Sequence, residues 1–207
     1  MLGPVGTLTV RGARMGSGVV LSVAGGLVCL SVVLVLGWAL AAYNRLVRQR
    51  NQVRASWAQI DVQLKRRHDL IPNLVETVRG YAVHERATLD AVATARGGAI
   101  AAAGTPGVVD RAAAEDDLTR ALGRLFVLAE AYPQLKANQN FAALQGELTR
   151  TEDRIAYARQ FYNSAVLTFN TSVQSVPTNL IAGVGGFRPA DFFQARDGER
   201  ATVQLRY

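Results

Sequence analysis

The chain has few of the residues that build disulfide-linked, metal-binding or β-rich proteins. Cys29 is the single cysteine among 207 residues, which excludes a disulfide framework and a thiolate metal site. Aromatic residues make up only 7% of the sequence, and six prolines are present. Proline is rare between Tyr43 and Val176, and alanine is abundant there. This composition favours helices over a β-sandwich or a barrel.

Sequence motifs of catalysis are also missing. The chain contains no P-loop, no nucleophile elbow and no zinc-protease HExxH motif, and Gly183–Gly186 lacks the strand–helix context of a dinucleotide site. His84 has no second histidine one turn away, so it is no candidate metal ligand. We therefore expect no catalytic residues, no cofactor and no metal, and we expect that the protein is not an enzyme.

Charge is absent from one long stretch, residues 19–42. As a helix it would be roughly 36 Å long, enough to cross a hydrocarbon layer of about 30 Å. We predict a retained transmembrane helix. A cleaved signal peptide is the alternative, since Ala39-Leu40-Ala41 fits a cleavage site, but the apolar run exceeds the usual length of a signal core. Bulky Val28 before Cys29 disfavours a lipoprotein signal.

The net charge of +7 is unevenly distributed. Residues 45–67 hold seven basic side chains against Asp61 alone, whereas residues 68–207 hold fourteen basic and fifteen acidic side chains. No basic patch interleaved with aromatic residues accompanies this excess, so nucleic-acid binding is not expected. Basic residues near a span indicate the cytoplasmic side. They are more numerous after the span (Arg45, Arg48, Arg50, Arg54) than before it (Arg11, Arg14). We therefore expect a single-pass protein of the bacterial inner membrane, with its large domain in the cytoplasm.

Residues 1–18 are rich in glycine and lack periodicity, and we expect a flexible tail there. Small residues recur every four positions at Gly18, Ser22 and Gly26, on one face of the predicted span. Such a stripe permits close approach of a second transmembrane helix. Self-association is the corresponding hypothesis, with the lipid bilayer as the other partner.

Apolar residues at three- and four-residue spacing predict four amphipathic helices within residues 43–176. We expect the first to continue from the span and to end near Asp69, because Pro72 disfavours helix in the residue before it. The second begins at Pro72 and fades into an Ala/Gly loop at 97–109. The third ends before Pro133, and the fourth runs from about Asn138 to Ser175. We predict an all-α protein with an antiparallel four-helix bundle, followed by an irregular tail at 177–207.

This topology places two turns at the end of the bundle far from the membrane. The candidate partner-binding tip comprises Lys65, Arg66, Arg67, Asp69, Asn73, Tyr132 and Lys136. Charged residues on different helices are candidate polar pairs that fix helix register, namely Asp61, Arg96, Glu152 and Arg159. His68 lies in the predicted distal turn, and it could act as an acid or base only if a carboxylate orients it.

Several motifs resemble the LemA family of bacterial membrane proteins, over about residues 19–195. They are Tyr43-Asn44-Arg45-Leu46-Val47, Leu64-Lys65-Arg66-Arg67, Asp69-Leu70-Ile71-Pro72-Asn73, Gly80-Tyr81, Ala95-Arg96, Ala131-Tyr132-Pro133, Thr151-Glu152-Asp153-Arg154, Tyr162-Asn163, Asn179-Leu180 and Gly186-Phe187. The resemblance implies one N-terminal span and an antiparallel four-helix bundle, but no established biochemical activity. Some relatives are linked to intracellular membrane organelles.

Three hypotheses of function follow. The leading one is a membrane-anchored, non-enzymatic scaffold or adaptor that presents its distal tip to a protein partner. The first alternative is a membrane-organising or remodelling component, which uses the basic first helix and the apolar tail against lipid. The second alternative is an accessory subunit or enzyme with a site at the distal turn.

Overall fold

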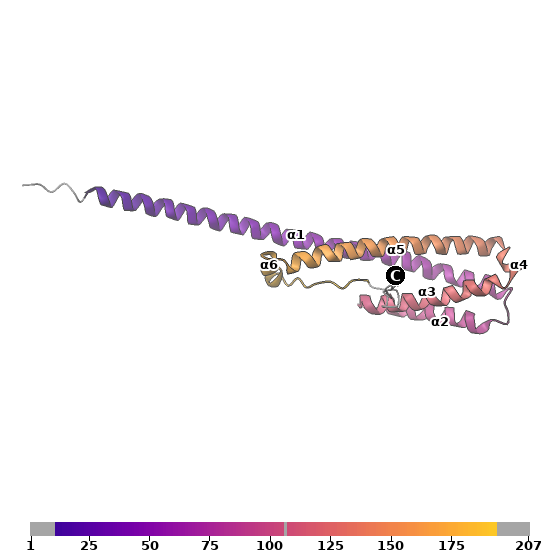
Figure 1. The fold of residues 1–207 in the computed structure, drawn as a ribbon. Helices are drawn as coiled ribbons and strands as arrows, with labels where there is room; N and C mark the ends of the chain where they lie inside the picture. Colours follow the sequence, from indigo (N-terminus) through magenta and orange to yellow (C-terminus); the bar gives the residue numbers. More distant parts are fainter. Residues whose placement is uncertain (1–10, 106, 194–207) are drawn as a thin grey trace, which may run out of the picture.

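The computed structural model describes residues 11–105 and 107–193, with side chains from Leu21 onward. Every regular element in these ranges is a helix. One helix, α1 (Arg11–Arg79), contains 69 residues and is therefore roughly 100 Å long. Figure 1 shows that its N-terminal part projects alone and that the other helices gather along its C-terminal part. The fold is thus all-helical, with one long apolar N-terminal helix.

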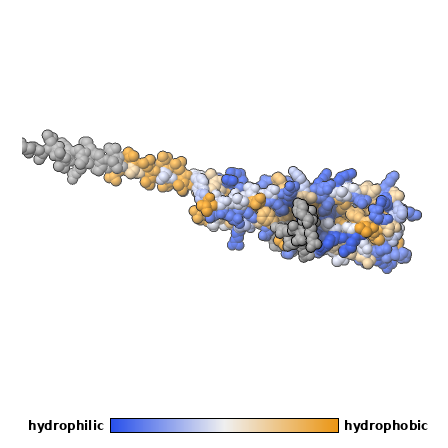
Figure 2. Space-filling view, in the orientation of Figure 1, coloured by the Kyte–Doolittle hydropathy of each residue, from blue (hydrophilic) through white to orange (hydrophobic). Residues whose placement is uncertain are grey.

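The projecting part of α1 has the character of a membrane span. It contains an 18-residue window with a mean hydropathy of 2.4, and no residue of that window is buried. It is the one helix among the described residues that is long and apolar enough to cross a membrane. In Figure 2 this segment is apolar, whereas the surface of the domain beside it is mixed and largely hydrophilic.

The predicted break at Pro72 is wrong, because α1 passes through this proline and ends at Arg79. A proline inside a helix costs about 3 kcal/mol. The apolar residues around it, Ile71, Leu74 and Val78, are all buried. Full burial of one such side chain contributes about 1.5–3 kcal/mol, so packing offsets the loss at Pro72. The turn lies instead at residues 80–85, after Gly80.

The remaining helices also differ from the predicted boundaries. They are α2 (Arg86–Ala103), α3 (Val108–Glu130), the short α4 (Pro133–Lys136), α5 (Gln139–Gln174) and α6 (Thr178–Val184). The predicted Ala/Gly loop is wrong up to Ala103, since α2 continues through Gly97 and Gly98. The tail contains α6, and residues 11–18 are helical, whereas irregular structure was expected in both places.

The helices form two pairs of different length. The long α5 packs against α1, and the shorter α2 and α3 pack against each other beside the distal part of α1 (Figure 1). The structure therefore contains a long pair of helices, α1 and α5, and a short pair, α2 and α3. Asn138 begins α5 as its N-cap, where its side-chain oxygen accepts hydrogen bonds from the backbone N–H groups of Asn140 and Phe141.

Two apolar cores follow one another along the long axis of the domain. The distal core joins α1, α2, α3 and α5, and the core nearer to the apolar segment joins α1 and α5 to the segment after α6. Leu64 belongs to the nearer core and Ile71 to the distal core. Between them α1 carries two buried polar residues, Arg67 and His68. A polar layer therefore separates the two cores.

Two asparagines of α5 hold the segment after α6 in place. Asn170 donates from Nδ2 to the Ala190 carbonyl oxygen (2.9 Å) and accepts from the Ala190 N–H (2.8 Å). Asn163 makes the same two contacts with Phe193, at 3.0 and 2.9 Å. Each side-chain amide thus satisfies both polar groups of one backbone residue, as a neighbouring β-strand would. Phe193 is consequently buried, and Trp57 packs against its ring.

Tyr162 of α5 is enclosed by this segment. Its hydroxyl donates to the Asp191 carbonyl oxygen (2.8 Å), and its ring packs edge-on against Trp57. Burial, reinforced by the nearby Asp191 carboxylate, raises the pKa of Tyr162 to about 12. Between about pH 10 and pH 12, the folded protein therefore keeps the hydroxyl proton of Tyr162, whereas an unfolded tyrosine, whose pKa is about 10, has released it.

This difference predicts a loss of stability at alkaline pH. The contribution is complete below pH 10 and falls as the pH rises toward 12, by roughly 2–3 kcal/mol in total. Unfolding of the detergent-solubilised protein at several pH values measures it. The control Tyr162→Phe should remove this component of the pH dependence. An unchanged alkaline slope in that variant would show that other groups cause it.

Candidate functional site

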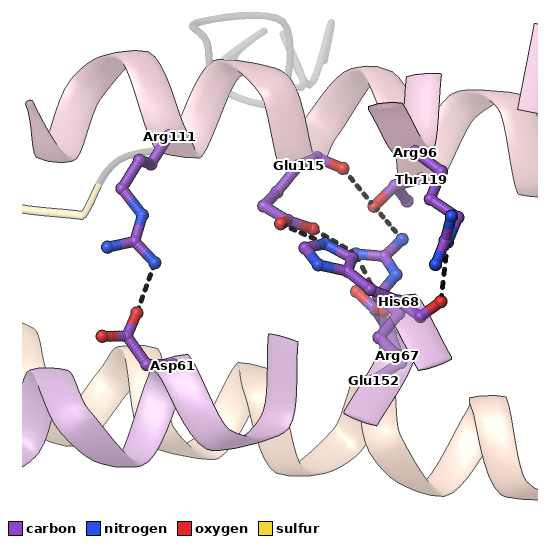
Figure 3. Close-up of polar contacts among 8 residues, drawn as sticks. All are labelled: Asp61, Arg67, His68, Arg96, Arg111, Glu115, Thr119 and Glu152. Atoms are coloured by element: carbon purple, nitrogen blue, oxygen red, sulfur yellow. Dashed lines mark hydrogen bonds and ion pairs between the residues drawn. The ribbon is translucent and has the colours of Figure 1, made fainter. Parts of the chain in front are cut away.

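The polar layer between the two cores is the most elaborate arrangement of charged side chains in the described part of the chain (Figure 3). Its centre is Glu115 of α3, which is buried together with Arg67 and His68 of α1. His68 Nε2 lies 2.8 Å from Glu115 Oε1, and Arg67 Nη1 lies 3.5 Å from Glu115 Oε2. Because a carboxylate only accepts, His68 is the hydrogen-bond donor.

Further contacts extend the layer to the other long helices. Arg67 Nη2 donates to Thr119 Oγ1 on α3 (2.6 Å), and Arg67 Nη1 lies 3.5 Å from Glu152 Oε2 on α5. Arg96 of α2 donates from Nε to the His68 carbonyl oxygen (2.8 Å). The cluster thus connects α1, α2, α3 and α5 at one level of the domain. Shifting one helix along another would leave a buried charge without its partner, so the layer fixes the register of the helices.

The layer lies between two clefts. One, of about 280 Å³, is lined by Arg67 and Glu152, and the other, of about 410 Å³, by His68 and Arg111. Glu115 supplies the orienting carboxylate that acid–base chemistry at His68 requires. However, both side chains are only 8% exposed, and Arg67 faces the other oxygen of Glu115. This geometry favours a structural role, in which the buried ion pairs hold the helices in register. The described residues contain no group of three His, Cys, Asp or Glu side chains that could hold a metal.

The predicted polar pairs lie at helix contacts but do not pair with one another. Asp61 forms an ion pair with Arg111 of α3, whose guanidinium also lies over the Trp57 ring. The guanidinium of Arg159 lies 4.7 Å from the centre of the Phe193 ring. Glu152 faces Arg67, and Arg96 reaches the backbone of α1, as described above. Each residue therefore joins two elements, through partners that the sequence did not indicate.

The residues of the predicted distal tip are separated by the structure. Most of the set lies along α1, below the end of the domain (Lys65, Arg66, Arg67, Asp69, Asn73). Arg67 points inward, and Arg66 donates to Glu147 of α5 (2.6 Å), which lowers the pKa of Glu147. Tyr132 and Lys136 do lie at the far end, as the N-cap and the last residue of α4. The error follows from the misplaced turn, because Pro72 does not end α1.

The true far end is built by the residue 80–85 turn and α4. Asn138 donates to the Tyr81 hydroxyl (2.9 Å), and the Tyr132 hydroxyl donates to Glu85 Oε1 (3.2 Å). Burial raises the pKa of Tyr132, and the Glu85 carboxylate adds to the effect. A pocket of about 320 Å³ opens here, lined by Tyr81, Ala131, Tyr132, Pro133 and Gln134. Its lining is mixed, with polar and apolar atoms in similar measure, and its two phenol groups are fixed by hydrogen bonds.

The predicted transmembrane stripe lies on the projecting part of α1. Ser22 and Gly26 are exposed there, and a Cβ atom added at Gly26 would meet nothing within 4 Å. Gly18 belongs to the same helix, and its surroundings lie outside the described side chains.

The sequence did not predict the contacts made by Glu115 in the polar layer or by Asn163 and Asn170 with the segment after α6. The sequence did carry a signal for Glu115, which precedes Leu118 by three positions and Leu122 by seven, on the apolar seam of α3. A carboxylate on such a seam predicts a buried partner. No comparable signal marked Asn163 and Asn170, whose partners are backbone groups twenty to thirty residues later.

The geometry defines a class of protein: an all-helical domain carried on a helix that could cross a membrane. The profile of the LemA family matches residues 56–207, and the chain belongs to this family. Over 190 residues it is 28% identical to magnetosome protein MamQ 1 of Paramagnetospirillum magneticum and 27% identical to magnetosome protein MamQ of Magnetospirillum gryphiswaldense. Both alignments cover 81% of this chain and 70% of the relative. It is 26% identical over 161 residues to protein LemA of Metamycoplasma hominis, covering 77% of this chain and 72% of that protein. The predicted family is thus confirmed, and with the apolar part of α1 it supports a LemA-like, membrane-associated protein.

The buried layer predicts a large effect of Glu115→Gln. Removing the charge leaves Arg67 buried with only the more exposed Glu152 opposite, so we expect a loss of about 3 kcal/mol. Thermal unfolding in detergent, followed by circular dichroism, measures the shift. Glu76→Gln, which breaks the exposed ion pair with Arg79 on the same helix α1, is the matched control and should unfold near the parent temperature. Equal shifts in both variants would contradict a register-fixing role.

Proposed function

We propose that this protein is a membrane-anchored, non-enzymatic scaffold that presents its far-end pocket to a protein partner. The observation that carries this proposal is the continuity of α1. The same helix contains the apolar segment and reaches the far end without interruption. From Ala42 to Arg79 it rises roughly 55 Å. The pocket is therefore held at a fixed height above the membrane surface.

The chemistry of the pocket fits a protein partner. Tyrosine is enriched at protein interfaces, because its ring offers a large apolar surface and its hydroxyl a hydrogen bond. Here the hydrogen bonds from Asn138 to Tyr81 and from Tyr132 to Glu85 fix the two phenols in advance. Preformed side chains lose less conformational entropy on binding. We infer that the pocket receives an apolar or aromatic side chain of the partner.

The side of the membrane is part of the proposal. Arginines directly after the apolar segment (Arg45, Arg48, Arg50, Arg54) outnumber those before it (Arg11, Arg14). This asymmetry supports a domain in the cytoplasm of a bacterial cell. The partner is then a cytoplasmic protein or the cytoplasmic part of a membrane protein.

A photocrosslinking amino acid at Gln134, which lines the pocket, tests the scaffold role in living cells. We expect a discrete covalent adduct with a cytoplasmic protein, and we expect Tyr132→Ala to weaken it strongly. The matched control carries the crosslinker at Gln145 on α5, away from the pocket. Identical adducts at both positions, or no effect of Tyr132→Ala, would contradict binding at the pocket. An adduct only with proteins outside the cytoplasm would contradict the orientation.

A second function, the organisation of membranes, is favoured by α6. This helix lies at the end of the domain nearest to the apolar part of α1 (Figure 1). It exposes Leu180 and Val184, which are 68% and 94% accessible, and Val176 just before it is 80% accessible. Apolar side chains at this level could enter the lipid headgroup region. The tail rings Phe187 and Phe193 cannot do so in this structure, because both are buried in the domain.

An environment-sensitive dye at Val184→Cys tests this second function, in a Cys29→Ser background reconstituted into anionic vesicles. If α6 enters the headgroup region, spin-labelled lipids should quench the dye. The same dye at Val127→Cys, on the exposed face of α3, is the control and should stay unquenched. Equal quenching at both positions would exclude a specific membrane contact of α6.

A further inference from the structure

Among residues 11–105 and 107–193, no element covers the outer face of the α1–α5 pair along much of its length. Two neighbouring grooves lie on it, of about 610 and 230 Å³, and all of their lining residues belong to α1 or α5. The larger groove is lined by Val62 and Tyr157, which are 63% and 73% exposed. The smaller contains Phe161, and its ring is also exposed.

The residues of both grooves recur at the spacing of a helix-packing seam. On α1 they are Gln49, Gln52, Gln59 and Gln63, separated by three, seven and four positions. On α5 they include Tyr157, Phe161, Ser164 and Thr168, separated by four, three and four positions. Steps of three and four place these side chains in one line along each helix, as in paired helices. The face is therefore shaped to receive further helices.

Each groove also holds a hydrogen-bond acceptor that lacks a donor. The side-chain oxygens of Gln49 and Gln63 are buried, and neither has a partner among the described residues. A buried acceptor without a donor costs about 1–3 kcal/mol. The exposed side chain of Tyr157 lines the larger groove beside Gln63, and its hydroxyl has no hydrogen bond to the described residues. A partner at this face can therefore bond to this hydroxyl in place of water.

The apolar part of α1 decides how a second copy would approach. Two chains anchored in one membrane stand parallel, so a two-fold axis along the membrane normal relates them. Rotation about this axis keeps every residue at the same distance from the membrane, so the grooves of the two chains lie at the same level. The groove residues of α1 then face Tyr157 and its neighbours on α5 of the other chain. No other partner is held at this height and orientation by the structure itself.

The projecting part of α1 is compatible with this approach. Ala58 and Val62 line the larger groove, and Ser22 and Gly26 precede them by 36 positions. Ten turns of 3.6 residues span 36 positions, so these small residues share a helix face with the groove. Two copies that meet at the groove would meet in the membrane at small residues, which allow close approach.

We propose that this face binds a second copy of the chain, with α1 of each protomer packed against α5 of the other. The exposed ring of Tyr157 on one protomer then packs against the exposed Val62 in the groove of its partner, and the reverse contact forms by symmetry. Asp153 and Arg154 are adjacent at the groove, so the symmetry allows Asp153 of one protomer to pair with Arg154 of the other, once on each side of the axis. This inference goes beyond the proposed scaffold role and does not depend on it.

Site-specific crosslinking of the full-length protein in native membranes tests the proposal. In a Cys29→Ser background, Gln59→Cys places one thiol in the larger groove, so a short bismaleimide can link only two different chains. We expect a covalent dimer. Val127→Cys, exposed on α3, is the control and should remain monomeric. An adduct with a different protein, or equal dimer at both positions, would overturn the proposal.

A second substitution separates this face from contacts confined to the membrane. Tyr157→Glu, added to Gln59→Cys, places a carboxylate in the groove, and the dimer yield should fall about tenfold, equivalent to about 1.4 kcal/mol. Its melting temperature should match the parent, because Tyr157 is exposed. An unchanged yield would assign the dimer to the membrane segment and overturn the proposal. The Gln134 adduct, measured in the same cells, reports on the scaffold role separately.

Discussion

The ion pair between Arg67 and Glu115 constrains the rest of the structure. It lies between two apolar cores, and apolar contacts alone tolerate sliding of one helix along another because they have little directionality. A buried guanidinium and carboxylate tolerate no such shift, since an unpaired charge in the interior costs several kcal/mol. The layer also includes His68, Thr119, Glu152 and Arg96, and so it connects α1, α2, α3 and α5. The polar layer thus determines the position of the distal helices along α1. The position of the far-end pocket follows from that of these helices.

The long helix depends on this packing as much as on its own propensity. Pro72 removes one backbone hydrogen bond four residues after His68, where the local sequence favours a break. The helix continues because the polar layer holds it on one side of the proline and the distal core holds it on the other. A continuous helix transmits position from the membrane to the far end without a hinge. Rigidity at Pro72 is therefore a tertiary property, and the proposed scaffold role relies on it.

The helical class, the apolar segment and most of the core seams could be predicted from the sequence, because helix periodicity is a local signal. Leu46, Ile60, Leu74, Leu118 and Tyr162, for example, lie on apolar stripes at helix spacing and are buried. The turn could not be placed, because the local preference of Pro72 is overridden by side chains distant in sequence. For the same reason the polar residues Asp61, Arg96, Glu152 and Arg159 were found without their partners. Those partners depend on how far α2 and α3 extend along α1, which no local pattern reports.

The outer face of the α1–α5 pair combines exposed apolar side chains (Val62, Tyr157, Phe161) with glutamines and hydroxyls, and this mixture has a physical consequence for assembly. An apolar face of this length would associate before insertion into the membrane, or aggregate. Glutamines and hydroxyls keep it soluble in the monomer, at the cost of weaker packing in a dimer. Anchoring in a membrane compensates, because it restricts both chains to two dimensions and one orientation. Part of the entropy lost on association is then already lost on insertion. A face of mixed character, which pairs only weakly by itself, is therefore suited to reversible pairing at a membrane.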